Sequence, residues 1–231
     1  MSTNIFFNAH HSPVGAFATL TLGCKGPKGG FGLELSGPAN ESIYVGIEEE
    51  EGRYRALPFY GGSEVAAEDY DVEGLSDLRY ASALQPFRDN EITRLFGAGV
   101  DEWRAGDLTF RIVSPPQSVP DPESSTAQEA LAPAILVELT LDNRSGERPR
   151  RAFFGYAGSD RSVGMRILDE PGLVGVGQGT SIAIATDDLG VYAGLAWQPE
   201  AILAPRLEEN LGFMLGSTGL LVGTVPAGEI K

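Results

Sequence analysis

Two adjacent histidines, His10 and His11, are the side chains of this sequence best suited to handling a proton or binding a ligand. Neighbouring residues of an extended strand point to opposite faces, so the two cannot hold one metal ion together without a bulge. They are also the only histidines of the chain, which excludes the usual histidine spacings of zinc sites. An imidazole offers one donor and one acceptor, so either residue suits a sugar hydroxyl, with an ordinary loop histidine as the alternative.

Paired carboxylates are the second group that could carry chemistry. The pairs along the chain are Asp69/Asp71, Asp187/Asp188 and Glu208/Glu209. A glycosidase needs two carboxylates that oppose each other across a pocket, about 5 to 9.5 Å apart. Adjacent acids diverge, so we expect these pairs on the solvated surface. The acidic run 48–51 is likewise interpreted as a solvated hairpin loop rather than a metal site.

Other familiar motifs are missing or out of context. No G-x-S-x-G elbow supports a serine hydrolase. The glycine run at 175–179 is not followed by the helix that a phosphate-binding loop requires, and we interpret it as a flexible turn before a strand. Aromatic side chains could instead form a sugar-stacking platform, although core packing is their commoner role. The aromatic candidates are Phe6, Phe7, Trp103, Phe153, Phe154, Tyr156 and Trp197.

The charge and the cysteine content limit the classes of partner and cofactor that the chain is expected to bind. Lys and Arg number 17 against 32 Asp and Glu, a formal net charge of -15, so nucleic acid is not an expected partner. The single cysteine, Cys24, allows no intrachain disulfide and no cysteine-based zinc site, and no cofactor or metal is predicted. The first residues lack the features of a secretory signal and no apolar run could span a bilayer, so we expect no membrane association and a cytoplasmic location. The glycosylation sequons at Asn40 and Asn143 are then chance matches.

Short alternating runs separated by turn residues predict the fold class. The 30 glycines and 15 prolines fall mostly between these runs. We expect strands at 16–22, 43–47, 54–59, 100–103, 108–113, 134–141, 150–156, 180–186, 191–197, 211–215 and 220–225. The pattern predicts an all-β, two-sheet antiparallel β-sandwich of about a dozen strands with little helix, as one domain over residues 1–231.

Two connections are expected to be exceptions to this pattern. Residues 61–90 are interpreted as a surface excursion with one helical turn near 75–80. Residues 115–133 are linker-like, with a short helix at 128–131. Beyond the second of these, the runs 134–141 and 150–156 are predicted to pair as a hairpin.

Six segments, in order along the chain, carry a family resemblance. They are NIFFNAHHSPVGAF at 4–17, WRAGDLTF at 103–110, RRAFFG at 150–155, GVGQG at 175–179, LEEN at 207–210 and VPAGE at 225–229. Together they resemble the β-xylosidases of glycoside hydrolase family 52. The resemblance spans essentially the whole chain, which makes it more specific than any single motif above.

The resemblance implies a retaining enzyme that removes xylose from xylo-oligosaccharides, built from an N-terminal β-sandwich and a helical barrel. Because the family's catalytic carboxylates lie in the barrel, no catalytic residue carries over to this chain, which we expect to be inactive alone. The sandwich is expected to pack on the barrel and to complete the sugar pocket or a subunit interface. Asn8, His10 and His11, in the loop 8–15, are the candidate substrate-binding residues.

Two other functions stay open on sequence alone. An independent carbohydrate-binding module would need an exposed aromatic platform. A complete small glycosidase would need its own opposed carboxylates. The surface that normally covers a barrel would be apolar, which favours a homo-oligomer when it is left uncovered.

Overall fold

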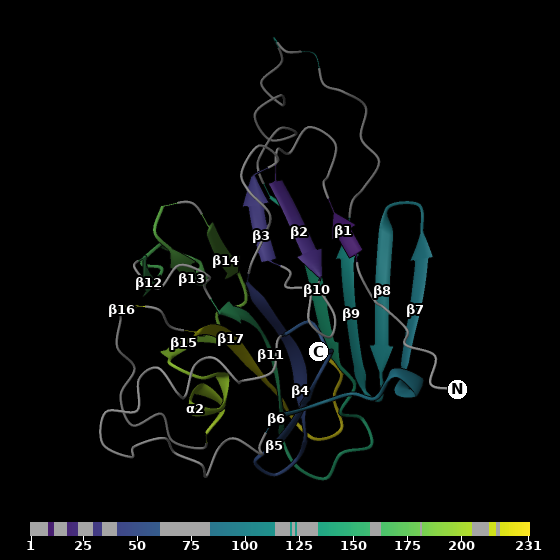
Figure 1. The fold of residues 1–231 in the computed structure, drawn as a ribbon. Helices are drawn as coiled ribbons and strands as arrows, with labels where there is room; N and C mark the ends of the chain where they lie inside the picture. The colour runs from purple at the N-terminus through teal and green to yellow at the C-terminus, as the bar shows by residue number, and fades with distance from the viewer. Residues whose placement is uncertain are drawn as a thin grey trace.

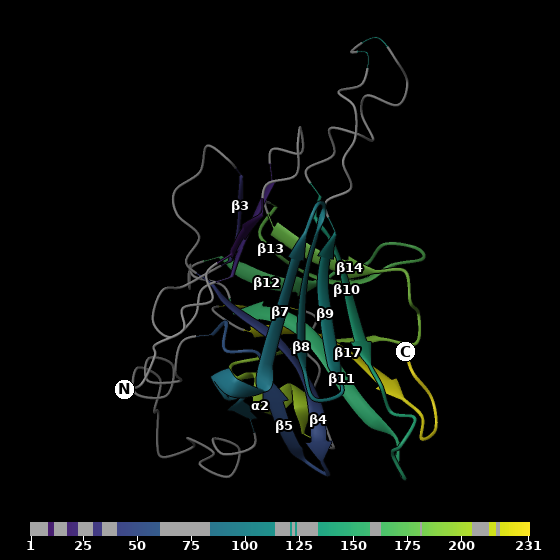
Figure 2. The ribbon, with the colours of Figure 1, turned by 90° about the vertical axis from the view of Figure 1, so that its right-hand side faces the viewer.

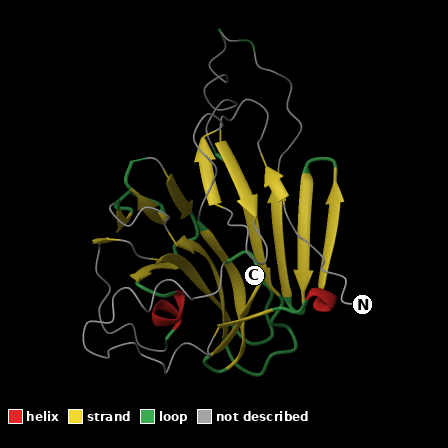
Figure 3. Cartoon of the chain, viewed as in Figure 1, coloured by secondary structure: helices red, strands yellow, loops and turns green. Residues whose placement is uncertain are grey.

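A computed structural model of the 231-residue chain shows an all-β protein. It describes residues 9–11, 18–22, 30–33, 41–60, 84–113, 121, 123, 134–157, 163–180, 182–204, 213–215 and 218–231. In this part of the chain, helix is confined to the short α2 (Pro199–Leu203) and the 3-10 turn η2 (Asp89–Glu91) (Figure 3). None of the described helices is long and apolar enough to cross a membrane.

A six-stranded sheet forms the centre of the molecule (Figure 1). Its strands, in spatial order, are β15 (Tyr192–Ala196), β17 (Thr218–Val225), β11 (Arg150–Ala157), β4 (Ser42–Glu50), β5 (Arg53–Ala56) and β6 (Leu84–Pro86). All neighbours run antiparallel except β5 and β6, which are parallel. Strands from both ends of the chain therefore meet in one sheet, with β11 between β4 and β17.

A four-stranded antiparallel meander faces this sheet (Figure 2). It consists of β7 (Ile92–Gly97), β8 (Val100–Ala105), β9 (Leu108–Val113) and β10 (Leu136–Leu141). The turn between β8 and β9 is tight because Gly106 adopts a φ of 56°, a conformation that favours glycine. Along β9 buried and half-buried residues alternate, as expected for a strand with one face on the core.

Two smaller sheets complete the described fold. One contains β1 (Ala9–His11), β2 (Ala18–Leu22) and β3 (Gly30–Leu33). The other contains β14 (Ile182–Thr186), β13 (Val174–Gln178), β12 (Gly164–Ile167) and β16 (Phe213–Leu215), in that spatial order. Leu20 of β2 and Val176 of β13 are buried in the main core, so both sheets pack on the sandwich.

The main core lies between the six-stranded sheet and the meander. Trp103 is fully buried and meets the ring of Phe59 edge to face, with ring centroids 4.9 Å apart. Phe110 of the meander packs against Phe154 of the central sheet, with centroids 5.9 Å apart. Burial of a phenylalanine such as Phe110 contributes about 1.5–3 kcal/mol relative to its exposed state.

The opposite face of the central sheet has a second, smaller core beneath α2. The hydroxyl of Tyr54 donates to the carbonyl oxygen of Leu203 at 2.6 Å, and that of Tyr192 donates to Ile202 at the same distance. A side chain at Gly194 would place its Cβ 2.6 Å from Ile202, so this glycine lets the helix approach the sheet. The central sheet is thus buried on both faces.

The predicted all-β sandwich with little helix is confirmed, but three local predictions are wrong. The runs at 134–141 and 150–156 do not form a hairpin, because β10 pairs with β9 whereas β11 pairs with β4 and β17. The glycine run is not a turn, because its first four residues lie in β13. The acidic run is not wholly a solvated loop, because Glu48 is buried and β4 extends to Glu50. The helical turns predicted near 75–80 and 128–131 lie outside the described residues.

Candidate functional site

The backbones of both predicted histidines lie on β1, so residues 9–11 of the predicted loop 8–15 form a strand, and that part of the loop prediction is wrong. His10 is the register partner of Thr21, and His11 that of Leu20. Leu20 belongs to the main core, so β1 borders the core at the end of the sandwich drawn uppermost in Figure 1. Asn8 lies outside the described residues, as do the side chains of His10 and His11. The role of these three residues in sugar binding stays a prediction.

Three of the four buried carboxylates in the described part of the chain, Glu48, Asp101 and Glu102, meet arginines, whereas the charge of the fourth, Glu41, acts on the Tyr156 hydroxyl. Asp101 binds Arg94 at 2.7 Å. Glu102 binds Arg104 at 2.5 Å and Arg111 at 3.0 Å. A carboxylate that shares its oxygens with guanidinium groups makes charge-assisted hydrogen bonds, as in a structural ion pair. Among the described residues, no cluster of three or more histidine, cysteine or acidic side chains is placed to hold a metal ion.

Among the carboxylates that the structure describes, Glu200 has the environment closest to that of a glycosidase acid. It lies in α2, where burial raises the pKa of its carboxyl group. Burial, followed by the charge of Glu200, also raises the pKa of the Tyr44 and Tyr60 hydroxyls. The rings of these two tyrosines lie 5.2 Å apart. A retaining glycosidase would need a second carboxylate about 5 Å from the first.

The predicted acidic pairs do not supply that second carboxylate in the described chain. Asp187 is exposed. Asp188 binds Nζ of Lys231 at 2.6 Å and accepts the backbone N–H of Gly190 at 2.9 Å, and these contacts lower its pKa. The other two pairs, at 69/71 and 208/209, lie outside the described residues.

Most of the predicted aromatic candidates belong to the core. Trp103, Phe153, Phe154 and Tyr156 are buried, whereas Trp197 is 51% exposed. Phe6 and Phe7 lie outside the described residues. The aromatic candidates therefore do not assemble a common stacking surface in the described structure, as the preference of aromatic side chains for a sandwich core would predict.

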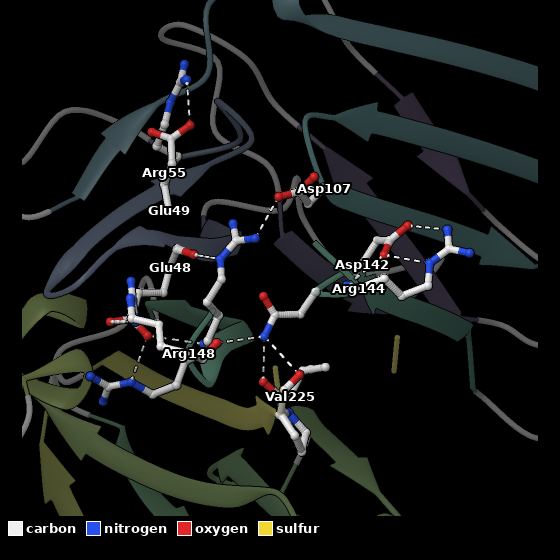
Figure 4. Close-up of polar contacts among 12 residues, drawn as sticks. Glu48, Glu49, Arg55, Asp107, Asp142, Arg144, Arg148 and Val225 are labelled. Atoms are coloured by element: carbon white, nitrogen blue, oxygen red, sulfur yellow. Dashed lines mark hydrogen bonds and ion pairs between the residues drawn. The ribbon is translucent and has the colours of Figure 1, made fainter. Parts of the chain in front are cut away.

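A polar cluster lies where the central sheet meets the turns at one end of the sandwich (Figure 4). Glu48 is at its centre. Its carboxylate accepts the backbone N–H groups of Gly52 at 3.1 Å and Arg151 at 3.2 Å. The guanidinium groups of Arg148 and Arg151 lie 3.3 and 3.5 Å away. These contacts compensate the burial of its charge, as a buried carboxylate requires.

Arg150 connects the two facing sheets. Its Nε donates to the carbonyl oxygen of Glu48 at 2.8 Å, and its Nη1 donates to Asp107 at 2.6 Å. Asp107 lies in the β8–β9 turn, whereas Glu48 lies on β4 (Figure 4). Arg150 therefore links the β8–β9 turn of the meander to β4 of the central sheet. This role is structural, and the carboxylate of Asp107 neutralises the charge of the arginine.

Asn143 organises the loop that carries the chain from β10 to β11. Its side-chain amide donates to the carbonyl oxygens of Arg148, Val225 and Pro226 at 2.9 to 3.0 Å. The backbone carbonyl oxygen of Asn143 accepts the backbone N–H groups of Gly146 and Gly228. The asparagine is fully buried.

This asparagine was missed as a structural residue by sequence reasoning, which considered it only as a sequon. The Asp-Asn pair followed by Gly146 is a turn composition and could have indicated its role. Beside it, Arg144 binds Asp142 through two side-chain hydrogen bonds and one from its backbone N–H, which lowers the pKa of Asp142 to about 2.

The described fold and polar contacts define a β-sandwich whose buried charges stabilise structure. The family model for glycosyl hydrolase family 52 matches residues 20–231, and the chain belongs to this family. The family predicted from the six sequence segments is thereby confirmed.

Two relatives show how much of such a protein the chain represents. It is 48% identical over its whole length to a beta-xylosidase of Geobacillus stearothermophilus, and this match covers 34% of that relative. A second beta-xylosidase from the same organism is 43% identical over 80% of the chain and 32% of the relative. The chain therefore spans about a third of the length of the curated relatives it matches.

Proposed function

We propose that this chain, as a single domain over residues 1–231, is the N-terminal, non-catalytic β-sandwich of a retaining β-xylosidase. The observation that carries the proposal is the 48% identity across the whole chain to a beta-xylosidase of which it covers 34%. The pairing of Glu48, Asp101 and Glu102 with arginines supports it, because these buried carboxylates are committed to structural contacts. The catalytic carboxylates then belong to a partner domain, the helical barrel.

In this proposal the substrate is a xylo-oligosaccharide, in the breakdown of xylan, and the sandwich packs on the barrel. The segment 8–15, which includes β1, reaches the sugar pocket, where Asn8, His10 and His11 donate to or accept from sugar hydroxyls. No cofactor takes part, since a retaining glycosidase works with two carboxylates and water. A cytoplasmic location is in keeping with a single cysteine, because disulfides belong to oxidising compartments.

A domain exchange tests the packing role. The chain would replace the matching third of the Geobacillus beta-xylosidase to which it is 48% identical. We expect the chimera to hydrolyse an aryl β-xyloside, whereas the relative without its sandwich would not. A chimera that folds but stays inactive would contradict the proposed packing role.

Histidine variants of the active chimera test the pocket. His10→Ala and His11→Ala should raise KM or lower kcat, at unchanged thermal stability. Kinetics unchanged in both variants would remove the histidines from the sugar site while leaving the packing role intact.

Two exposed aromatic rings support a second candidate function, that of a carbohydrate-binding module. Trp197 is 51% and Phe213 59% exposed. A module of this kind stacks aromatic rings on sugars. Calorimetric titration of the chain with xylo-oligosaccharides would detect such a module. Binding that is lost in Trp197→Ala or Phe213→Ala would favour the carbohydrate-binding module. A titration that shows no heat of binding would favour the packing domain.

A further inference from the structure

One edge of β10 carries no strand in the described part of the chain. The other edge is paired with β9. Just beyond the end of β10, Asp142 forms an antiparallel bridge with Ile230. Figure 2 shows the C-terminus on the same side of the meander as β10. The last residues of the chain therefore arrive at the edge of β10 that faces away from β9.

These C-terminal residues begin a ladder on the free edge. The backbone N–H of Leu141 donates to the carbonyl oxygen of Lys231 at 2.8 Å, and the N–H of Lys231 donates back to Leu141 at 3.2 Å. Two residues that exchange both bonds form a hydrogen-bonded pair of an antiparallel ladder. The bridge between Asp142 and Ile230 has the same direction. An extended continuation beyond Lys231 would therefore run along β10 towards Leu136.

The ladder also shows which backbone groups of β10 face the free edge. Hydrogen-bonded pairs alternate along an antiparallel ladder, so the amide and carbonyl groups of Leu139 and Val137 point the same way as those of Leu141. The groups of the residues between them point towards β9. Asp142 agrees with this alternation, because its N–H donates to the carbonyl oxygen of Asp107, beside β9, at 2.9 Å. The free edge thus offers two donors and two acceptors at the next positions of the ladder.

The composition of β10 does not oppose a further strand. Lysines, prolines and unpaired charges usually protect edge strands from pairing. β10 contains neither lysine nor proline, and its one charged residue, Glu138, binds Arg111 on β9 at 2.8 Å. Leu136, at the far end, is 61% exposed, whereas Val137 and Leu139 pack against the main core. The strand is thus held on the sandwich while one edge stays open to pairing.

We propose that the polypeptide that follows Lys231 in the full-length enzyme pairs antiparallel with β10, as a fifth strand of the meander, on its way to the helical barrel. The inference rests on the proposed function, in which this chain is the N-terminal third of a longer enzyme. The second residue after Lys231 then lies opposite Leu139, and the fourth lies opposite Val137. Because the first pair of the ladder is already formed, the next pairs cost little loop-closure entropy, which favours this segment over a separate peptide.

The added strand determines at which end of the sandwich the barrel begins. A strand antiparallel to β10 is parallel to β9, and β9 points towards the end of the sandwich drawn uppermost in Figure 1. β1, with the backbones of His10 and His11, lies at the same end. This route therefore leads the chain to the end of the sandwich that carries segment 8–15, for which sugar contacts are proposed.

Amide hydrogen exchange measured by NMR tests the pairing in an extended chain. The chain would be extended beyond Lys231 by about six residues, the length of a typical strand, taken from the segment that follows the matched region in the 48% identical relative. We expect the amides of Val137 and Leu139 to exchange at least about tenfold more slowly than in the 231-residue chain. The amides of Glu138 and Thr140, which point towards β9, should change much less.

A matched control extension carries proline at its second and fourth residues, because proline lacks the N–H that the ladder needs. With this extension, Val137 and Leu139 should exchange as fast as in the chain without it. Unchanged exchange with the first extension, or equal protection with the proline extension, would overturn the pairing.

The chimera with the Geobacillus barrel separates this inference from the proposed function. Mass-resolved exchange of peptides that span β10 should show protection in the chimera relative to the isolated chain. An active chimera in which β10 exchanges as fast as in the isolated chain would refute the pairing and leave the packing role intact. A folded but inactive chimera with a protected β10 would support the pairing and contradict the packing role.

Discussion

The side-chain amide of Asn143 donates to the carbonyl oxygen of Val225 at 3.0 Å, across 82 residues of sequence. This contact joins the loop after β10 to the end of β17. Leu141 and Lys231 add two backbone hydrogen bonds beside it, at 2.8 and 3.2 Å. The last described residues are therefore fixed to the sandwich by one buried asparagine and a short backbone pairing.

Asn143→Ala should lower the free energy of unfolding by about 2–4 kcal/mol, because it leaves several buried carbonyl oxygens without a donor. Urea unfolding measures the change. Asn90→Ala, at an exposed position, is the matched control and should shift stability by no more than about 0.5 kcal/mol. Equal, small shifts in both variants would show that Asn143 does not hold this loop.

Glu48→Ala should be the most damaging change in the acidic run. It leaves Arg148 and Arg151 beside an empty buried position and removes the acceptor of two backbone N–H groups. We expect a loss of about 3–5 kcal/mol in urea unfolding, the range for one partner removed from a buried ion pair. Glu51→Ala, in the exposed turn of the same run, should be nearly neutral. Similar stabilities would contradict the buried role of Glu48.

Gly46 lies where a side chain cannot fit. A Cβ there would lie 2.3 Å from the carbonyl oxygen of Arg55 and 2.4 Å from the ring of Phe153. Gly46→Ala should therefore destabilise the chain by about 1–3 kcal/mol, as overpacking does. Gly97→Ala is the control, since nothing lies within 4 Å of its added Cβ. A thermal melt of Gly46→Ala that matches this control would refute the close packing of β4 on β11.

The burial of Glu200 makes stability depend on pH. Because the folded state raises the pKa of its carboxyl group, the folded chain binds this proton more tightly than the unfolded chain. Its contribution is fully present below the ordinary glutamate pKa and is lost as pH rises through the folded pKa. Glu200→Gln should therefore stabilise the chain at about pH 7 and have little effect at about pH 4.

Denaturant midpoints at the two pH values measure this difference. Glu147→Gln, at an exposed position, supplies the control for the change of one charge. A Glu200→Gln variant that is stabilised equally at both pH values, or only at the lower one, would contradict the assigned burial effect.

The sequence predicted the fold class well because alternation reports which face of a strand is buried. The sequence could not predict which strands pair with each other, because the alternation of buried and exposed residues is the same whichever strand lies alongside. The runs around Leu141 and Arg150 resemble a hairpin on this criterion, yet the loop between them crosses from one sheet to the other. That crossing depends on Asn143 and its contacts with distant residues, which no local pattern shows.

At the glycines of β13, the sequence led to a second kind of error, because part of a strand was predicted to be a turn. Gly175 and Gly177 indicated a turn, but they lie in a strand where Leu168 packs across them. A Cβ at Gly175 would lie 2.5 Å from the Leu168 side chain. Between them, Val176 faces the core. In the candidate site, the proximity of His10 and His11 follows directly from the sequence, because they are adjacent. The ion pairs of Glu48 could be seen only in the three-dimensional arrangement.

Turnover of an aryl β-xyloside by the purified 231-residue chain tests the central claim most directly. A long incubation against a matched blank should show no hydrolysis, because the proposed domain lacks the two opposed carboxylates that the reaction needs. Clear hydrolysis that is lost on a single Asp or Glu substitution within the chain, Glu200→Gln among those tried, would contradict the account. The active site would then lie in these residues.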